Sequence, residues 1–119
     1  MGFVWLDEYL LSKQGSRKDY KEEWGWDRYL LLDKMFAAIC VNKQGKKIIT
    51  LKCPPEMSIQ IREEYEFITE GYYMNKVHWI SVYLESDVPE ELLKNLVDQS
   101  YELILKSFSK KIQNGIVMR

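Results

Sequence analysis

The sequence contains few of the residues on which catalytic and metal sites depend. Among its 119 residues there is one histidine, His78, and there are two cysteines, Cys40 and Cys53. No CxxC or HxxxH spacing relates them, so the chain lacks the usual pattern of zinc ligands. The GxSxG nucleophile motif, the glycine loop that cradles phosphates and the dinucleotide fingerprint are also missing. We therefore expect no bound metal, no cofactor and no enzymatic activity.

The chain also lacks long apolar runs and a recognisable export leader. Hydrophobic residues make up 46% of the sequence, but no run approaches the roughly 20 residues that cross a bilayer. The opening residues, MGFVWLDE, contain two acids and no basic leader, unlike a secretory signal. Two cysteines in apolar, strand-like contexts favour buried reduced thiols over a disulfide. We expect a cytoplasmic monomer with no membrane contact.

The net charge of −1 conceals an uneven distribution of charge along the chain. Residues 34–55 contain five lysines and no acid, and residues 106–119 contain three lysines and one arginine, again without an acid. The isoelectric point near 5.9 is low for a protein that binds nucleic acid over its whole surface. Any such binding must therefore come from a local basic patch.

The spacing of apolar residues predicts one α+β domain over residues 1–119. We expect two layers, with helices packed on one face of a mostly antiparallel sheet, in the order α-β(3–4)-α-β(1–2)-α. The predicted helices cover residues 3–13, 54–65 and 87–111, and the predicted strands cover residues 20–24, 28–32, 35–41, 46–53 and 75–84. Residues 42–45 have the composition of a hairpin turn, and residues 68–71 that of a turn. Asp87 and Glu90 have the spacing of a capping box, and residues 112–115 are expected to end the last helix.

The predicted strand over residues 75–84 is the clearest in the chain. Its alternation puts His78 on the same side as Ile80, Val82 and Leu84, which favours the core and a structural role for the histidine. The opposite side carries Val77, Trp79, Ser81 and Tyr83. A helix could cover this second side, or it could remain exposed as a binding surface.

Four segments resemble the MmcQ/YjbR-like family of small bacterial proteins. They are Lys34-Met35-Phe36-Ala37, Leu51-Lys52-Cys53-Pro54, Asn75-Lys76-Val77-His78-Trp79-Ile80 and Ser100-Tyr101, and they span most of the chain in the same order. The resemblance implies the two-layer fold of secretion chaperones and CyaY-like, frataxin-related proteins, with helices on one face of a curved antiparallel sheet. It also implies a DNA-binding role, in which two hairpin wings grip the duplex.

Lysines around the predicted hairpin turn are the candidates for contacting double-stranded DNA. Lys43, Lys46 and Lys47 could meet phosphates, with an attraction that weakens as salt is added. They could equally protect an edge strand from aggregation. A second contact region would comprise Lys52, Asn75, Lys76 and Trp79.

Two other functions remain open from the sequence. The sheet face around Trp79 and Tyr83 could bind a protein or a peptide, as the architecture of secretion chaperones suggests. A pocket around His78 could instead bind a small molecule.

Overall fold

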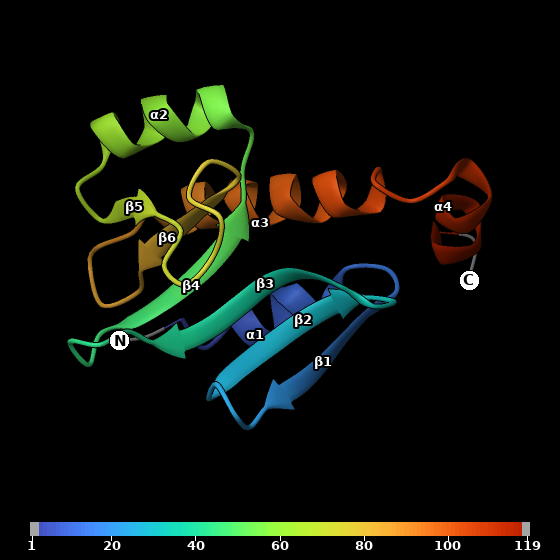
Figure 1. Ribbon diagram of the computed structural model, residues 1–119, viewed down its shortest axis with the longest axis horizontal. Helices are drawn as coiled ribbons and strands as arrows, with labels where there is room; N and C mark the ends of the chain where they lie inside the picture. Colours follow the sequence, from blue (N-terminus) through green and yellow to red (C-terminus); the bar gives the residue numbers. More distant parts are fainter. Residues whose placement is uncertain (1–2, 118–119) are drawn as a thin grey trace.

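The computed structural model describes residues 3–117 and confirms an α+β fold (Figure 1). Its helices are α1 (Leu6–Ser12), α2 (Pro55–Glu64), α3 (Glu90–Leu105) and α4 (Lys110–Val117). Its strands are β1 (Ser16–Lys21), β2 (Trp26–Leu31), β3 (Lys34–Val41), β4 (Lys47–Lys52), β5 (Ile68–Glu70) and β6 (Trp79–Tyr83). No helix within these residues has both the length and the apolar character needed to cross a bilayer.

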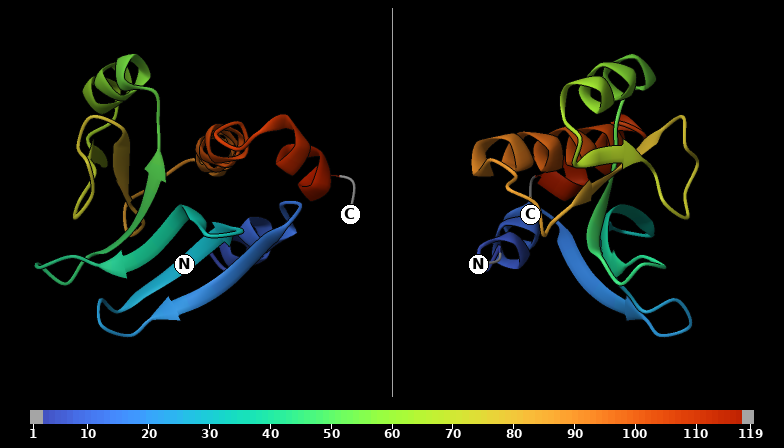
Figure 2. Two further views of the ribbon diagram at one scale, coloured as in Figure 1. Left: turned by 45° about the vertical axis from the view of Figure 1, so that its right-hand side comes forward. Right: turned by 90° about the vertical axis from the view of Figure 1, so that its left-hand side faces the viewer.

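The strands form one antiparallel sheet in the order β1-β2-β3-β4-β6-β5. The first four strands follow one another as hairpins. The chain then leaves the sheet through α2, and β6 enters between β4 and β5. Figure 2 shows the sheet curving beneath the helices, with the loop between β5 and β6 on the opposite side.

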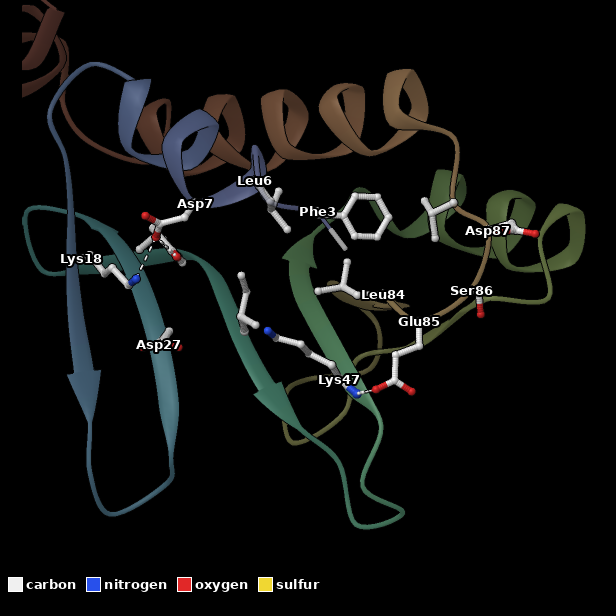
Figure 3. A pocket seen from close by; sticks show the side chains of 13 residues that line it. Phe3, Leu6, Asp7, Lys18, Asp27, Lys47, Leu84, Glu85, Ser86 and Asp87 are labelled. Carbon is white, nitrogen blue, oxygen red and sulfur yellow. Dashed lines mark hydrogen bonds and ion pairs between the residues drawn. The ribbon is translucent and has the colours of Figure 1, made fainter. Parts of the chain in front are cut away.

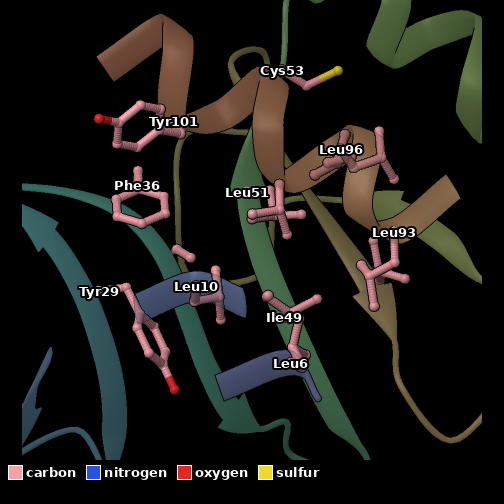
Figure 4. Packing of buried hydrophobic residues seen from close by; sticks show 14 of the residues in the cluster. Leu6, Leu10, Tyr29, Phe36, Ile49, Leu51, Cys53, Leu93, Leu96 and Tyr101 are labelled. Carbon is pink, nitrogen blue, oxygen red and sulfur yellow. The ribbon is translucent and has the colours of Figure 1, made fainter. Parts of the chain in front are cut away.

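The core lies between the central strands and α3 (Figure 4). Ile49 and Leu51 of β4 are fully buried and pair directly with Val82 and Ile80 of β6. The helix covers them with an apolar stripe formed by Leu93, Leu96, Val97, Tyr101, Ile104 and Leu105. Each such side chain contributes roughly 1.5–3 kcal/mol when fully buried. The predicted inward placement of Ile80, Val82 and Leu84 is confirmed, because all three belong to this cluster.

A β-bulge in β3 fixes how α3 sits on the sheet. Tyr29 pairs with Ala37, but the next residue, Leu30, pairs with Met35, so Phe36 is the extra residue. Phe36 and Ala37 consequently both join the core beneath the helices.

The side chain of Ser100 in α3 holds this bulge. Its Oγ donates a hydrogen bond to the carbonyl oxygen of Phe36 (2.6 Å) and accepts one from the backbone N–H of Lys52 (2.8 Å). Ser100 is fully buried. One hydroxyl therefore links the helix to the bulge in β3 and to the end of β4.

The prediction that residues 75–78 continue the β6 strand is wrong. The strand begins at Trp79, and the preceding residues form a turn. The Oδ1 atom of Asn75 accepts hydrogen bonds from the backbone N–H groups of Val77 (2.9 Å) and His78 (3.2 Å), which favours the turn over an extended backbone. His78 is exposed and has no place in the core.

Several predicted boundaries also change. Residues 68–70 form the short strand β5 instead of a turn, because their backbone pairs with β6. Residues 22–25, placed partly in a strand, form the turn between β1 and β2. The capping box is wrong as well. The N-cap of α3 is Pro89, and no side chain caps the helix.

The predicted last helix is two helices. The chain leaves α3 through tight turns in which the N–H groups of Ser107 and Phe108 bond to Ile104 and Leu105. A new helix, α4, then follows and continues through Gly115, which was expected to stop it.

Candidate functional site

The sheet surface opposite the helices, called here the open face, consists of the side chains that point outward along five strands. By alternation and register these are Arg17, Asp19 and Lys21 of β1, Trp26 and Arg28 of β2, Ala38 and Cys40 of β3, Ile48, Thr50 and Lys52 of β4, and Trp79, Ser81 and Tyr83 of β6. A second apolar cluster forms here around Trp26, Ala38, Cys40 and Ile48. Among these strand positions there are four cationic side chains and one acid.

Three of the four helices carry an excess of acids. Helix α1 carries two acids, α2 carries three and α3 carries four, whereas their basic residues are only Arg62 and Lys94. Acids therefore predominate on α1, α2 and α3 and cations on the open face, whereas α4 carries Lys110 and Lys111 and no acid. This polarity is invisible in the net charge of −1.

Residues 71–78, called here the crossing loop, partly cover the open face. The backbone N–H of Tyr72 donates to Ser81 Oγ (2.9 Å), which also hydrogen-bonds to Thr50 Oγ1 (3.0 Å). The side chain of the same residue reaches the β3–β4 turn, where the hydroxyl of Tyr72 accepts a hydrogen bond from the backbone N–H of Lys43 (3.3 Å). A loop, not a helix, thus covers this side, and it leaves Trp79 half-buried.

The three hairpin lysines that were predicted to act together do not share one surface. Lys43 and Lys46 are exposed in the turn between β3 and β4. The turn is held by Asn42, whose Oδ1 accepts from the backbone N–H groups of Gln44 and Lys46, both at 2.9 Å. Lys47 points to the helical side and lines a different cleft.

The predicted second contact region assembles at one end of the open face. Lys52 pairs directly with Trp79. Lys76 lies in the adjacent crossing loop, where its Nζ donates to the carbonyl oxygen of Gly71 (3.3 Å). The side chain of Asn75 is engaged in shaping the loop, so we regard it as a positioning residue.

An aromatic cleft that the sequence analysis missed lies on the same face. It measures about 620 Å³ and is lined by Trp24, Trp26, Arg28, Met35, Tyr73 and Met74. The rings of Trp24 and Trp26 are 4.9 Å apart between centroids, and those of Trp26 and Tyr73 are 5.9 Å apart. Trp26 is buried, whereas Trp24 and Tyr73 are 55% and 49% exposed. The pair of tryptophans around Gly25 was the available sequence signal.

Two cations stand at the rim of the aromatic cleft. Arg28 donates from Nε to Asp19 Oδ1 (2.8 Å) and from Nη2 to Asp19 Oδ2 (2.6 Å), which fixes its guanidinium in place. These hydrogen bonds hold the pKa of Asp19 below its usual range. Lys21 places its Nζ atom 5.1 Å from the centroid of the Trp24 ring. The cleft is therefore aromatic inside, with Lys21 and the Arg28–Asp19 ion pair at its edge.

A second cleft, of about 680 Å³, opens on the helical side between the start of α1 and the strands (Figure 3). Asp7 accepts hydrogen bonds there from Lys18 Nζ (2.8 Å) and from the hydroxyl of Tyr29 (2.5 Å), and these lower its pKa. Burial, followed by the bond to Asp7, raises the pKa of Tyr29. The lining mixes charges of both signs, including Lys47 and Glu85.

His78 lies exposed in the crossing loop. The residue lines neither cleft. Across residues 3–117, no group of three or more histidine, cysteine, aspartate or glutamate side chains is placed to hold a metal ion.

Comparison with known proteins identifies the family. Residues 11–103 match the family model YjbR, which covers well over half of the chain. The chain belongs to the YjbR family. This assignment confirms the resemblance deduced from the four sequence segments.

The relatives include three uncharacterised bacterial proteins. The chain is 27% identical to YjbR of Escherichia coli K12 over 97 residues, which cover 82% of this chain and 81% of YjbR. It is 32% identical to YyaQ of Bacillus subtilis over 79% of this chain and 98% of YyaQ. It is 37% identical to YbdF of Escherichia coli O157:H7 over 73 residues, 61% of this chain and 60% of the length of YbdF.

Solved structures share the fold. The crystal structure of protein DR2400 from Deinococcus radiodurans matches with a TM-score of 0.82 and 26% identity, over 93% of this chain and 84% of that one. A crystal structure from Pseudomonas syringae matches with a TM-score of 0.75 and 24% identity, over 87% of this chain and 99% of that one.

Proposed function

We propose that this YjbR-family protein is a non-enzymatic DNA-binding domain that contacts phosphates through its open face and the β3–β4 turn. The observation that carries the proposal is the separation of charge. Arg17, Lys21, Arg28 and Lys52 lie on the open face with a single acid, while α1, α2 and α3 on the other side carry more acids than bases. A polyanion would be attracted to one side of the molecule and repelled by the other.

The β3–β4 turn supplies the most accessible cations. Lys43 and Lys46 are exposed, and the Asn42 hydrogen bonds give the turn a defined shape. The β1–β2 turn instead carries Glu22 and Glu23, so we assign the phosphate contacts chiefly to the β3–β4 turn. Neutralising a phosphate releases its counterions. In a plot of the logarithm of the binding constant against the logarithm of the salt concentration, each neutralised phosphate makes the slope more negative by about 0.9.

The test measures the anisotropy of a fluorescent mixed-sequence duplex over a range of salt concentrations. The double variant Lys43→Ala/Lys46→Ala should weaken binding and reduce the salt slope by about 2. The matched control, Lys110→Ala/Lys111→Ala, removes the same charge from α4 and should change binding little. Lys47→Ala should also leave DNA binding unchanged, because Lys47 points to the helical side. Absence of wild-type binding to both duplex and single-stranded DNA at low salt, or equal losses in both double variants, would refute the proposal.

A protein- or peptide-binding module is the second candidate. The exposed apolar rings of Trp24 and Tyr73 favour it, because exposed aromatic residues are common anchors in protein interfaces. The proposed peptide site is therefore not the one predicted around Trp79 and Tyr83, because the crossing loop leaves those two residues only half-exposed. A protein partner retained after nuclease treatment and high salt, and lost in Trp24→Ala, would support it.

We place the proposed activity in the cytoplasm, with the protein acting as a monomer. Cys40 and Cys53 are buried free thiols. Burial raises the pKa of both, that of Cys53 to about 11. Unpaired thiols are ordinary in a reducing compartment, which supports this location.

A further inference from the structure

We infer that the aromatic cleft binds an unpaired nucleobase, so that the protein prefers single-stranded or locally opened DNA to a closed duplex. This inference rests on the proposed function and gives it a specific form. It assigns the turn lysines to the phosphate backbone and the cleft to one exposed base.

The rings in the cleft offer flat apolar surface that the fold itself does not use. Trp24 comes from the β1–β2 turn and Tyr73 from the crossing loop, and both rings pack beside the buried Trp26. Each leaves about half of its surface in solvent. Stacking on such rings tolerates any base, because every base has an aromatic face.

The backbone at Tyr73 adds a second indication. Its φ angle is +69°, in the left-handed region that residues other than Gly, Asn and Asp seldom adopt. The ring of Tyr73 also contacts that of Tyr72 edge-on at 4.3 Å. A strained position that presents an exposed aromatic ring at the edge of a cleft is typical of a binding site.

The charges at the rim select an anionic occupant. Arg28 is fixed by Asp19, and the two hydrogen bonds of that pair use two of its five N–H donors. Lys21 stands beside the Trp24 ring. A nucleotide joins a flat base to a phosphate and matches both features. A neutral apolar peptide would cover the rings while desolvating Lys21 and the Arg28–Asp19 ion pair without offering either an anionic group, which costs free energy.

The base must be unpaired for a geometric reason. In a closed duplex both faces of each base are stacked on neighbours, so an aromatic side chain reaches them only after the base leaves the stack. The cleft lies between the β1–β2 turn and the crossing loop and holds about 620 Å³. Single-stranded DNA can place a base there without a cost of unpairing.

The experiment compares three fluorescent oligonucleotides of one sequence: the single strand, its duplex, and the single strand with abasic sites. The wild-type protein should bind the intact strand most tightly and quench tryptophan emission on binding. Trp24→Ala and Tyr73→Asn should each weaken strand binding about 5- to 100-fold, the range expected for one stacked base. Asparagine tolerates the positive φ angle, so Tyr73→Asn removes the ring without straining the loop.

Two further variants sharpen the assignment. Tyr20→Ala removes an exposed aromatic ring from the helical face of β1, opposite Asp27, and should leave strand binding unchanged. The double variant Glu22→Gln/Glu23→Gln removes two acids from the turn that carries Trp24, and should tighten strand binding because the backbone passes close by.

The outcomes separate this inference from the proposed function. Binding to neither strand nor duplex refutes both. Equal affinity for strand, abasic strand and duplex, or unchanged strand binding in both cleft variants, refutes the inference alone. Binding of a labelled acidic peptide containing tryptophan, lost in Trp24→Ala while no oligonucleotide binds, would make the occupant a peptide and overturn the inference.

Discussion

Replacing Ser100 by alanine should destabilise the protein far more than the loss of one oxygen atom suggests. The hydroxyl donates to the Phe36 carbonyl oxygen and accepts from the Lys52 N–H. Ser100 is fully buried, so alanine leaves two backbone groups unsatisfied away from water. Each unsatisfied buried group costs about 1–3 kcal/mol, and partial relaxation brings the expected total to about 2–4 kcal/mol. In a domain of this size that loss lowers the Tm by about 8–16 °C.

Urea unfolding followed by circular dichroism measures this loss directly. The matched control is Ser107→Ala, because the Ser107 hydroxyl also bonds to a backbone carbonyl, that of Ile104, but at an exposed position. The control should lose less than about 1 kcal/mol. Because Ser100 holds the backbone of Lys52, Ser100→Ala should also weaken DNA binding under conditions where it remains folded. A loss in Ser100→Ala no greater than that of the control would refute the role of the hydroxyl as a clamp.

Two further predictions concern acid sensitivity and strand packing. Hydrogen bonds from Lys18 and then from Tyr29 lower the pKa of Asp7 below its ordinary 3.8. The stability that they supply is present above that value and is lost as the pH falls through the lowered pKa. Asp7→Asn should therefore be less stable than wild type near neutral pH, with urea midpoints that converge below about pH 3; a constant difference down to about pH 2 would contradict this. Gly71→Ala should destabilise by about 1–3 kcal/mol, because its Cβ would lie 2.7 Å from Trp79 Cβ. Gly115→Ala in α4 should instead raise the Tm, because its added Cβ would have no atom within 4 Å and alanine favours helix. If thermal melts showed that Gly71→Ala and Gly115→Ala shift the Tm in the same direction, the packing argument would be contradicted.

Local patterns predicted the parts of the fold whose side chains alternate strongly. The β3–β4 hairpin, its turn at residues 42–45 and the inward placement of Ile80 and Val82 follow from apolar periodicity. The same reasoning failed over residues 75–78, where the Asn75 side chain supplies hydrogen bonds that stop the strand. It also missed β5, because three residues contain too little alternation to stand out and pair only when β6 is beside them.

The candidate site, like the fold, was predicted only in part from the sequence. Lys43 and Lys46 were predicted to lie at an exposed hairpin turn, Lys46 as the first residue of the strand, and both are exposed. Lys47, next in the chain, points the other way, because consecutive residues of a strand face opposite sides of the sheet. Trp24, Arg28 and Tyr73 were not recognised together, since the cleft joins the β1–β2 hairpin to the crossing loop, which is distant in sequence.

The sequence by itself determined the class of fold, the family and the acid-free lysine cluster, because composition, periodicity and short motifs are properties of neighbouring residues. Only the tertiary structure decided which side of the sheet each charge occupies and which aromatic rings share a cleft. Those features depend on strand register, on the bulge at Phe36 and on the course of the crossing loop. The bulge is held by Ser100 and the crossing loop by Ser81 and Thr50, so both depend on contacts between residues far apart along the chain, which local patterns do not record.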